Sequence, residues 1–279
     1  MVLGTAQFGM DYGIANISGK PTKKVIFSIL DLAWEKGVRR FDTAPGYGSE
    51  TLLGEFIFAN GLQNEAIVLT KIPSIEASED YMKVIKTSIE SSLKALGCPV
   101  GLLFFHNQTD ANLLLKDPKY FENILNIYPV SALGVSVYEK KDIVKLSRCE
   151  IELAFQFPFN VLDRRFEQVT MPKGKRYARS IFLQGLLVSK NALRFNAPKE
   201  LINLQKKYHD KLTDHNLDPV EIAVSFALCS DSVDYFLIGV DSAKQLRNIL
   251  ELEIIKRLDT SVFDEFLTNV NKNWFDPRI

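Results

Sequence analysis

Short apolar runs alternate along this chain with longer stretches in which apolar residues recur every three or four positions. Alternation of this kind predicts βαβ units, in which parallel strands are joined by helices. Eight runs have the length and composition of strands, at residues 2–8, 38–42, 67–71, 101–106, 132–136, 152–156, 177–182 and 235–239. Helical patterns lie between them, at 22–37, 78–97, 120–128, 139–146, 201–212, 219–228, 242–250 and 261–270.

Eight strands with interleaved helices, and no linker rich in proline, glycine or serine, predict one α/β domain over residues 1–279, a single (β/α)8 TIM barrel. A doubly wound open sheet is the alternative fold. It is the weaker interpretation because no GxGxxG follows the first strand, where a Rossmann dinucleotide site needs glycines.

The composition excludes several classes of partner. The 34 basic side chains balance 34 acidic ones, so we expect neither a nucleic-acid nor a membrane partner. No run approaches the length of a membrane span and no signal peptide is apparent, which indicates a cytoplasmic protein. Three widely separated cysteines predict no disulfide framework and no metal site. The balanced charge and ordinary hydrophobicity suggest a monomer or weak homodimer.

Five of the apolar runs end in a polar residue, and no two of these residues are of the same type: Asp42, Lys71, His106, Ser136 and Gln156. In a barrel the carboxyl ends of the strands form one face, and that face carries the active site. We therefore expect these side chains to converge on one pocket. The two remaining histidines, His209 and His215, lie among Lys, Asp and Asn residues on a polar helix, and we expect both to be solvated.

A tyrosine follows the first of these polar strand ends by five residues. Tyr47 is presented by a Pro-Gly turn after Asp42. A phenol has a reference pKa of about 10, and a neighbouring ammonium stabilises the phenolate and lowers that value. We expect Lys71 to supply the ammonium, Asp42 to hold it charged, and His106 to donate a hydrogen bond to a carbonyl oxygen. Such a site protonates an oxygen that gains negative charge, and a nicotinamide hydride is its natural complement.

Three motifs give the chain a resemblance to the aldo-keto reductase family that runs nearly end to end. FDTAPGYGSE resembles the DTAxxYG signature of that family, VLTK its strand-ending lysine and LLFFH its strand-ending histidine. The resemblance implies the catalytic residues Asp42, Tyr47, Lys71 and His106. It also implies a hairpin below the barrel, but LGTAQFG begins at residue 3, so we expect a barrel without that hairpin.

The resemblance also implies the cofactor contacts. Ser136 in LGVSVY and Gln156 in FQFPFN match residues that hold the nicotinamide carboxamide. RSIFLQGLL places Arg179 where an aromatic ring normally stacks on the nicotinamide. The other implied contacts surround the pyrophosphate and the adenosine end, and they are Ser180, Leu183, Gly185, Gly239, Val240, Ser242, Gln245 and Asn248. The family prefers NADPH, and Asp241, which would repel a 2′-phosphate, leaves NADH open.

The substrate is the least determined part of this interpretation. The resemblance implies a small carbonyl compound, with a sugar-like aldehyde or ketone as the first expectation, and Trp274 and Phe275 of the tail as candidate substrate contacts. Two other functions stay open. Lys71 could form a Schiff base in an aldolase or lyase, or the barrel could bind a nucleotide as a regulatory subunit.

Overall fold

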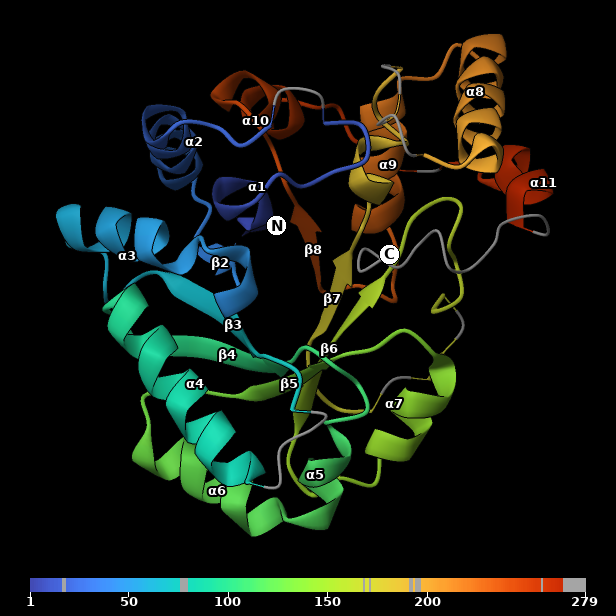
Figure 1. Ribbon diagram of the computed structural model, residues 1–279. Helices are drawn as coiled ribbons and strands as arrows, with labels where there is room; N and C mark the ends of the chain where they lie inside the picture. Colours follow the sequence, from blue (N-terminus) through green and yellow to red (C-terminus); the bar gives the residue numbers. More distant parts are fainter. Residues whose placement is uncertain are drawn as a thin grey trace.

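The computed structural model describes residues 1–16, 19–75, 80–167, 169–170, 172–190, 193, 197–256 and 258–267. Its strands form one closed barrel in chain order, all parallel, with β1 paired to β8, so the predicted (β/α)8 fold is confirmed. Helices surround the strands (Figure 1). The strands are β1 Val2–Gly4, β2 Arg40–Asp42, β3 Ile67–Ile72, β4 Val100–Phe105, β5 Leu133–Ser136, β6 Leu153–Pro158, β7 Arg176–Arg179 and β8 Tyr235–Ile238.

Several of the helices begin where the sequence supplies a cap. Thr22 and Asp80 accept hydrogen bonds from backbone N–H groups of the helices they precede, and Gly97 ends the second of these in the left-handed conformation. The helices are α1 Ala6–Gly9, α2 Lys23–Glu35, α3 Glu50–Ala59, α4 Tyr81–Leu96, α5 Asn112–Lys116, α6 Pro118–Ile127, α7 Lys140–Leu146, α8 Lys199–Asp214, α9 Pro219–Leu228, α10 Ala243–Leu250 and α11 Asp264–Leu267, with short 3-10 turns η1 Pro45–Tyr47, η2 Leu183–Gly185 and η3 Ser261–Phe263. Within the described residues, none of these helices combines the length and the apolar character that crossing a bilayer requires.

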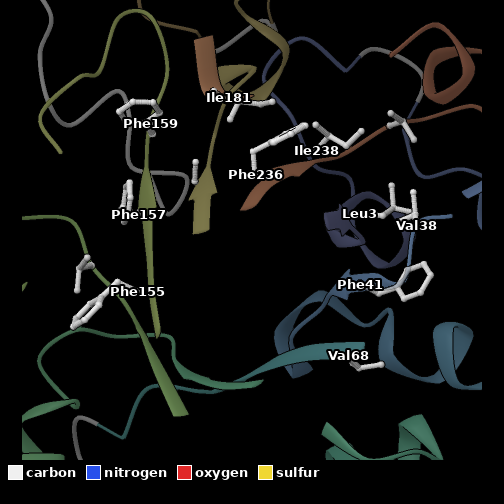
Figure 2. Close-up of a cluster of buried hydrophobic side chains, with 14 of the residues drawn as sticks. Leu3, Val38, Phe41, Val68, Phe155, Phe157, Phe159, Ile181, Phe236 and Ile238 are labelled. Carbon is white, nitrogen blue, oxygen red and sulfur yellow. The ribbon is translucent and has the colours of Figure 1, made fainter. Parts of the chain in front are cut away.

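Two apolar layers make up the core. The larger one lies between the strands and the surrounding helices, and Figure 2 labels several of its members on the strands, among them Phe41, Phe155 and Ile238. A smaller cluster fills the inside of the barrel, with Leu69, Phe104 and Tyr177 among its members. Because side chains alternate across a strand, those on one face of each strand pack in the outer layer and those on the other face point into the barrel.

The same alternation positions the polar strand ends. Residues two positions apart on a strand point to the same side of the sheet. Each of several interior apolar residues is therefore followed, one level higher in the barrel, by a polar residue that lines a cavity, as in the pairs Leu69 and Lys71, Phe104 and His106, Ala154 and Gln156, and Tyr177 and Arg179. The period of the strands thus brings four polar residues that are far apart in the sequence into one layer at the carboxyl end of the barrel.

Aromatic rings and an arginine fill the opposite end of the barrel. The guanidinium of Arg40 lies 4.4 Å from the centre of the Tyr235 ring. Tyr235 stacks on Tyr177 with 4.9 Å between ring centres, and Tyr177 packs edge-on against Phe104 at 5.8 Å. These side chains close the amino-terminal end of the barrel from within.

Two predicted strands end more than one residue earlier than expected. The first, predicted to reach Phe8, stops at Gly4, because the chain turns into helix α1, in which the Phe8 N–H donates to the carbonyl of Thr5. The seventh, predicted to reach Phe182, stops at Arg179, because Ser180 has a φ of 59° that no strand accommodates. Both strands therefore end at the cavity.

The prediction that His209 is solvated was wrong. It is 5% exposed, and its Nε2 lies 3.1 Å from the carbonyl oxygen of Leu186. Helix α8 buries a stripe of residues at helical spacing that includes Leu201, Tyr208 and His209, and Tyr208 packs against the rings of η3 and α11, which lie beside α8 in Figure 1. The other histidine of this region, His215, is exposed as expected.

Candidate active site

The loop that carries Tyr47 follows β2 directly. Pro45 begins η1, and Gly48 ends it with a φ of 70°, a left-handed conformation that favours glycine. Helix α1 lies against this loop so closely that a Cβ on Gly9 would come 1.8 Å from the carbonyl oxygen of Tyr47. The phenol is therefore fixed by backbone packing from two sides.

Three buried hydroxyl groups connect the loop to the strand ends beneath it. The Ser49 hydroxyl lies 2.8 Å from that of Thr5 and 2.9 Å from that of Thr43. The Thr5 hydroxyl also donates to the backbone carbonyl of Asp42 at 3.0 Å. Buried hydroxyls with these partners hold the start of the loop against β1 and β2. Nothing in the sequence indicated this network, since Thr5 and Ser49 are 44 residues apart along the chain.

Asp42 and Lys71 form a buried ion pair. The Lys71 ammonium donates to Asp42 Oδ1 at 2.7 Å and to the Thr43 carbonyl at 2.9 Å, and the two charged side chains are 2% and 5% exposed. Asp42 Oδ2 accepts from the amide of Gln156 at 2.9 Å. Both carboxylate oxygens and two of the three ammonium protons therefore have partners, as a charge pair in a barrel interior requires.

The phenol of Tyr47 lies among the other three predicted catalytic side chains. The Lys71 ammonium is 4.9 Å from the centre of the Tyr47 ring. The imidazole of His106 meets the same ring edge-on, with 6.3 Å between ring centres. All four side chains line one cavity, so the structure brings together the residues that were predicted to converge.

The pKa of Tyr47 moves opposite to the expected direction. Burial raises it above its ordinary value, the negative charge of Asp42 raises it further, and the Arg179 guanidinium opposes both. The Lys71 ammonium, which is paired with Asp42 at 2.7 Å, does not offset these two effects. Tyr47 therefore holds its proton throughout the physiological range, as a proton donor must before its reaction.

The cavity has a volume of about 650 Å³ and opens at the carboxyl end of the barrel. The residues that line the cavity extend from Ser136 on β5 to Asn248 on α10. Two tyrosines that the sequence analysis had not selected, Tyr12 and Tyr138, also line it. Tyr138 ends the quoted LGVSVY motif, so its position was available in the sequence, whereas nothing distinguished Tyr12.

The aldo/keto reductase family model matches residues 1–268 of this chain. The chain belongs to the aldo/keto reductase family. It is similar to the uncharacterized oxidoreductase YrpG of Bacillus subtilis, with 24% identity over 97% of this chain and 90% of that protein. It is also similar to pyridoxal 4-dehydrogenase of Microbacterium luteolum, with 22% identity over 87% of this chain and 86% of that protein. Among solved structures, an aldo-keto reductase from Bacillus halodurans in its holo form gives a TM-score of 0.76 at 18% identity, over 95% of this chain and 91% of that one.

Family membership makes this chain an oxidoreductase of a class that acts on carbonyl compounds and generally uses NAD(P)H. Nine of the eleven predicted cofactor residues line the cavity, namely Ser136, Gln156, Arg179, Ser180, Gly185, Gly239, Val240, Gln245 and Asn248. The other two do not line it. Leu183 is buried with a φ of 45°, and the Ser242 hydroxyl caps α10 by accepting from the Gln245 N–H at 3.2 Å. Trp274 and Phe275 lie outside the described residues.

The cavity residues fit a nicotinamide cofactor of this family. The Gln156 amide donates to Asp42, so its carbonyl oxygen is the atom that can accept from a carboxamide NH2. At the far end, Asp241 has a buried carboxylate oxygen without a hydrogen-bond partner, and burial raises its pKa. A carboxylate there can accept from a ribose hydroxyl. Within the described residues no three His, Cys, Asp or Glu side chains are grouped as a metal site requires.

Proposed function

We propose that this protein reduces an aldehyde or ketone to an alcohol with a nicotinamide cofactor, and that Tyr47 is its general acid. The observation that carries the proposal is the convergence, in one cavity, of a protonated phenol, an imidazole and a neutralised ion pair. None of these groups is placed as a nucleophile, whereas all of them suit the protonation of an oxygen.

The residues of the site divide the reaction between them. A reduced nicotinamide, when bound, supplies the hydride that adds to the carbonyl carbon. His106 donates a hydrogen bond to the carbonyl oxygen and fixes it near the Tyr47 hydroxyl. The oxygen gains negative charge and takes the phenolic proton, because an alkoxide is a much stronger base than a phenolate. Positioned proton transfer of this kind contributes roughly 10²- to 10⁴-fold to the rate.

Lys71 has its effect after the proton has left. The phenolate is then an anion beside an ammonium that lies 4.9 Å from the ring centre. The ammonium is already aimed by Asp42 and the Thr43 carbonyl, so stabilising the phenolate requires no rearrangement. Asp42 is a positioning residue in this scheme, because it acts on Lys71 and not on the substrate, and the Gln156 amide holds Asp42 in place.

The same contacts disfavour a Schiff-base mechanism. A lysine that donates to a carboxylate and to a backbone carbonyl is held as an ammonium, which has no free electron pair for attack on a carbonyl carbon. Borohydride in the presence of substrate should therefore leave Lys71 unmodified.

We propose NADPH as the preferred cofactor, with NADH as the alternative that Asp241 supports, and a sugar-like carbonyl compound as the substrate. Parallel fluorescence titrations with NADPH and NADH test the first part. Steady-state oxidation of the bound cofactor by a panel of small aldehydes and aldoses then tests the function. Binding of at least one cofactor and turnover of at least one aldehyde are expected. If the protein bound neither cofactor, the proposed reductase function would be rejected.

A further inference from the structure

Arg179, which its place in RSIFLQGLL led us to expect beside the nicotinamide, is a buried cation to which the proposed reaction assigns no step. It is 9% exposed, lies at the end of β7 and lines the cavity. Its Nη2 is buried without a hydrogen-bond acceptor, and its Nη1 has only a long contact of 3.4 Å to the Ser180 hydroxyl. The guanidinium lies over the ring of Tyr138 at 4.2 Å. In the described part of the chain no carboxylate lies within ion-pair distance of it.

Two other arginines of this protein have acidic partners. Arg176, at the opposite end of the same strand, donates to both oxygens of Asp234 at 3.0 and 3.1 Å. Arg165 pairs with Asp163 at 2.7 Å. A buried guanidinium without such a partner is costly, because the charge loses its hydration and gains no counter-ion.

The acids that line the cavity are committed elsewhere or do not reach Arg179. Asp42 is occupied by Lys71 and Gln156. Asp218 caps α9 by accepting from two backbone N–H groups at 2.9 Å. Asp241 forms no ion pair among the described residues and lies at the β8 to α10 junction. The positive charge of Arg179 is therefore balanced by no described acid of the cavity.

Arg179 and Tyr47 line the same cavity, and the guanidinium charge lowers the pKa of Tyr47 against the effect of burial. A substrate whose carbonyl oxygen meets Tyr47 would place neighbouring atoms near Arg179. A planar carboxylate matches the fork of a guanidinium and forms charge-assisted hydrogen bonds with it.

We propose that Arg179 binds the carboxylate of the substrate, so that this reductase acts on aldehydes or ketones that also carry a carboxylate. The inference rests on the proposed function, and it makes Arg179 a specificity-determining residue. The tyrosine ring beneath the guanidinium fixes its plane, so the anion meets a cation that is already oriented.

The test compares matched substrates that differ only in charge. One pair is 4-formylbenzoate and methyl 4-formylbenzoate, and the other is succinic semialdehyde and its methyl ester. Hydrogen bonds to charged groups are worth about 1.5–3 kcal/mol, so the wild type should favour each acid over its ester by roughly ten- to a hundredfold in kcat/KM. Arg179→Met should bring this ratio close to one, and Arg179→Lys should give an intermediate ratio.

Arg176→Met is the matched control, because it removes a guanidinium from the other end of β7 and should keep the wild-type ratio. A wild-type ratio near one would overturn the proposal, whether or not the variants fold. An acid-to-ester ratio that Arg179→Met leaves unchanged would also overturn it. If that variant in addition bound NADPH more weakly than the wild type, Arg179 would be assigned to the cofactor.

Calorimetric titration with terephthalate separates this inference from the proposed function, because it needs no turnover. Terephthalate binding that is lost in Arg179→Met supports the anion site even if no aldehyde is reduced. Turnover of neutral aldehydes without any preference for acids would support the proposed reductase function and reject the anion site. Absence of terephthalate binding to the wild type would also reject it.

Discussion

Replacing Lys71 with methionine should destabilise the barrel as well as slow the reaction, because the substitution leaves a buried carboxylate without its counter-ion. The ammonium and Asp42 Oδ1 are 2.7 Å apart, and at an effective dielectric constant of about 20 Coulomb's law gives about 6 kcal/mol of attraction at that distance. Desolvation of both charges offsets part of this attraction. Removal of one partner from a buried pair costs about 3–5 kcal/mol in comparable proteins.

The assay is urea unfolding followed by tryptophan fluorescence, since Trp34 packs parallel to Phe41 of β2. With an m-value of about 2–3 kcal/mol per molar urea, the expected loss moves the midpoint down by about 1–2 M. The double variant Asp42→Asn with Lys71→Met removes both charges of the pair and should recover most of this stability while remaining inactive. A loss below about 1 kcal/mol, or a double variant no more stable than Lys71→Met, would refute the role of the pair.

Further predictions concern three residues, His209, Asp241 and Gly9. Burial lowers the pKa of His209, so below about pH 6.5 the unfolded chain binds a proton that the folded chain does not. The free energy of unfolding should therefore fall with decreasing pH by at most about 1.4 kcal/mol per pH unit. Unfolding compared at about pH 5 and 7 should show this fall in the wild type, and His209→Gln should lack it. Asp241→Asn removes a buried negative charge and should improve the affinity for NADPH relative to NADH at least about tenfold in parallel titrations. Burial raises the pKa of Asp241, so its charged form opposes folding at neutral pH, and the same variant should unfold at higher urea concentration at pH 7. Gly9→Ala should displace the Tyr47 loop, at a cost of about 1–3 kcal/mol and with reduced kcat, whereas Gly46→Ala in the same loop meets nothing within 4 Å and should behave as wild type.

The barrel and the four catalytic candidates could be predicted because each rests on a local pattern. Apolar runs of strand length ended in chemically different polar residues, and parallel strands bring such ends to one face. Asp42, Lys71 and His106 needed no long-range information beyond the number of strands. Tyr47 was accessible for the same reason, since a Pro-Gly turn follows β2 immediately.

What the sequence did not reveal depends on contacts between distant segments. The prediction for Tyr47 counted the ammonium of Lys71 but not the burial of the phenol and the negative charge of Asp42, which together raise its pKa. Local polar neighbours hid the burial of His209, although its spacing of eight residues from Leu201 places both on one helix face. Backbone geometry at Ser180, with its positive φ, likewise has no signal in the residue type.

Single-turnover reduction by the Tyr47→Phe variant tests the central claim most directly. Enzyme preloaded with NADPH is mixed with an aldehyde that the wild type reduces, and the loss of cofactor fluorescence is followed. The variant should bind NADPH and fold as the wild type does, because the hydroxyl removed is no partner of the Asp42 and Lys71 pair. Its rate of hydride transfer should fall by roughly 10²- to 10⁴-fold. A rate within about threefold of the wild type would contradict the assignment of Tyr47 as the general acid.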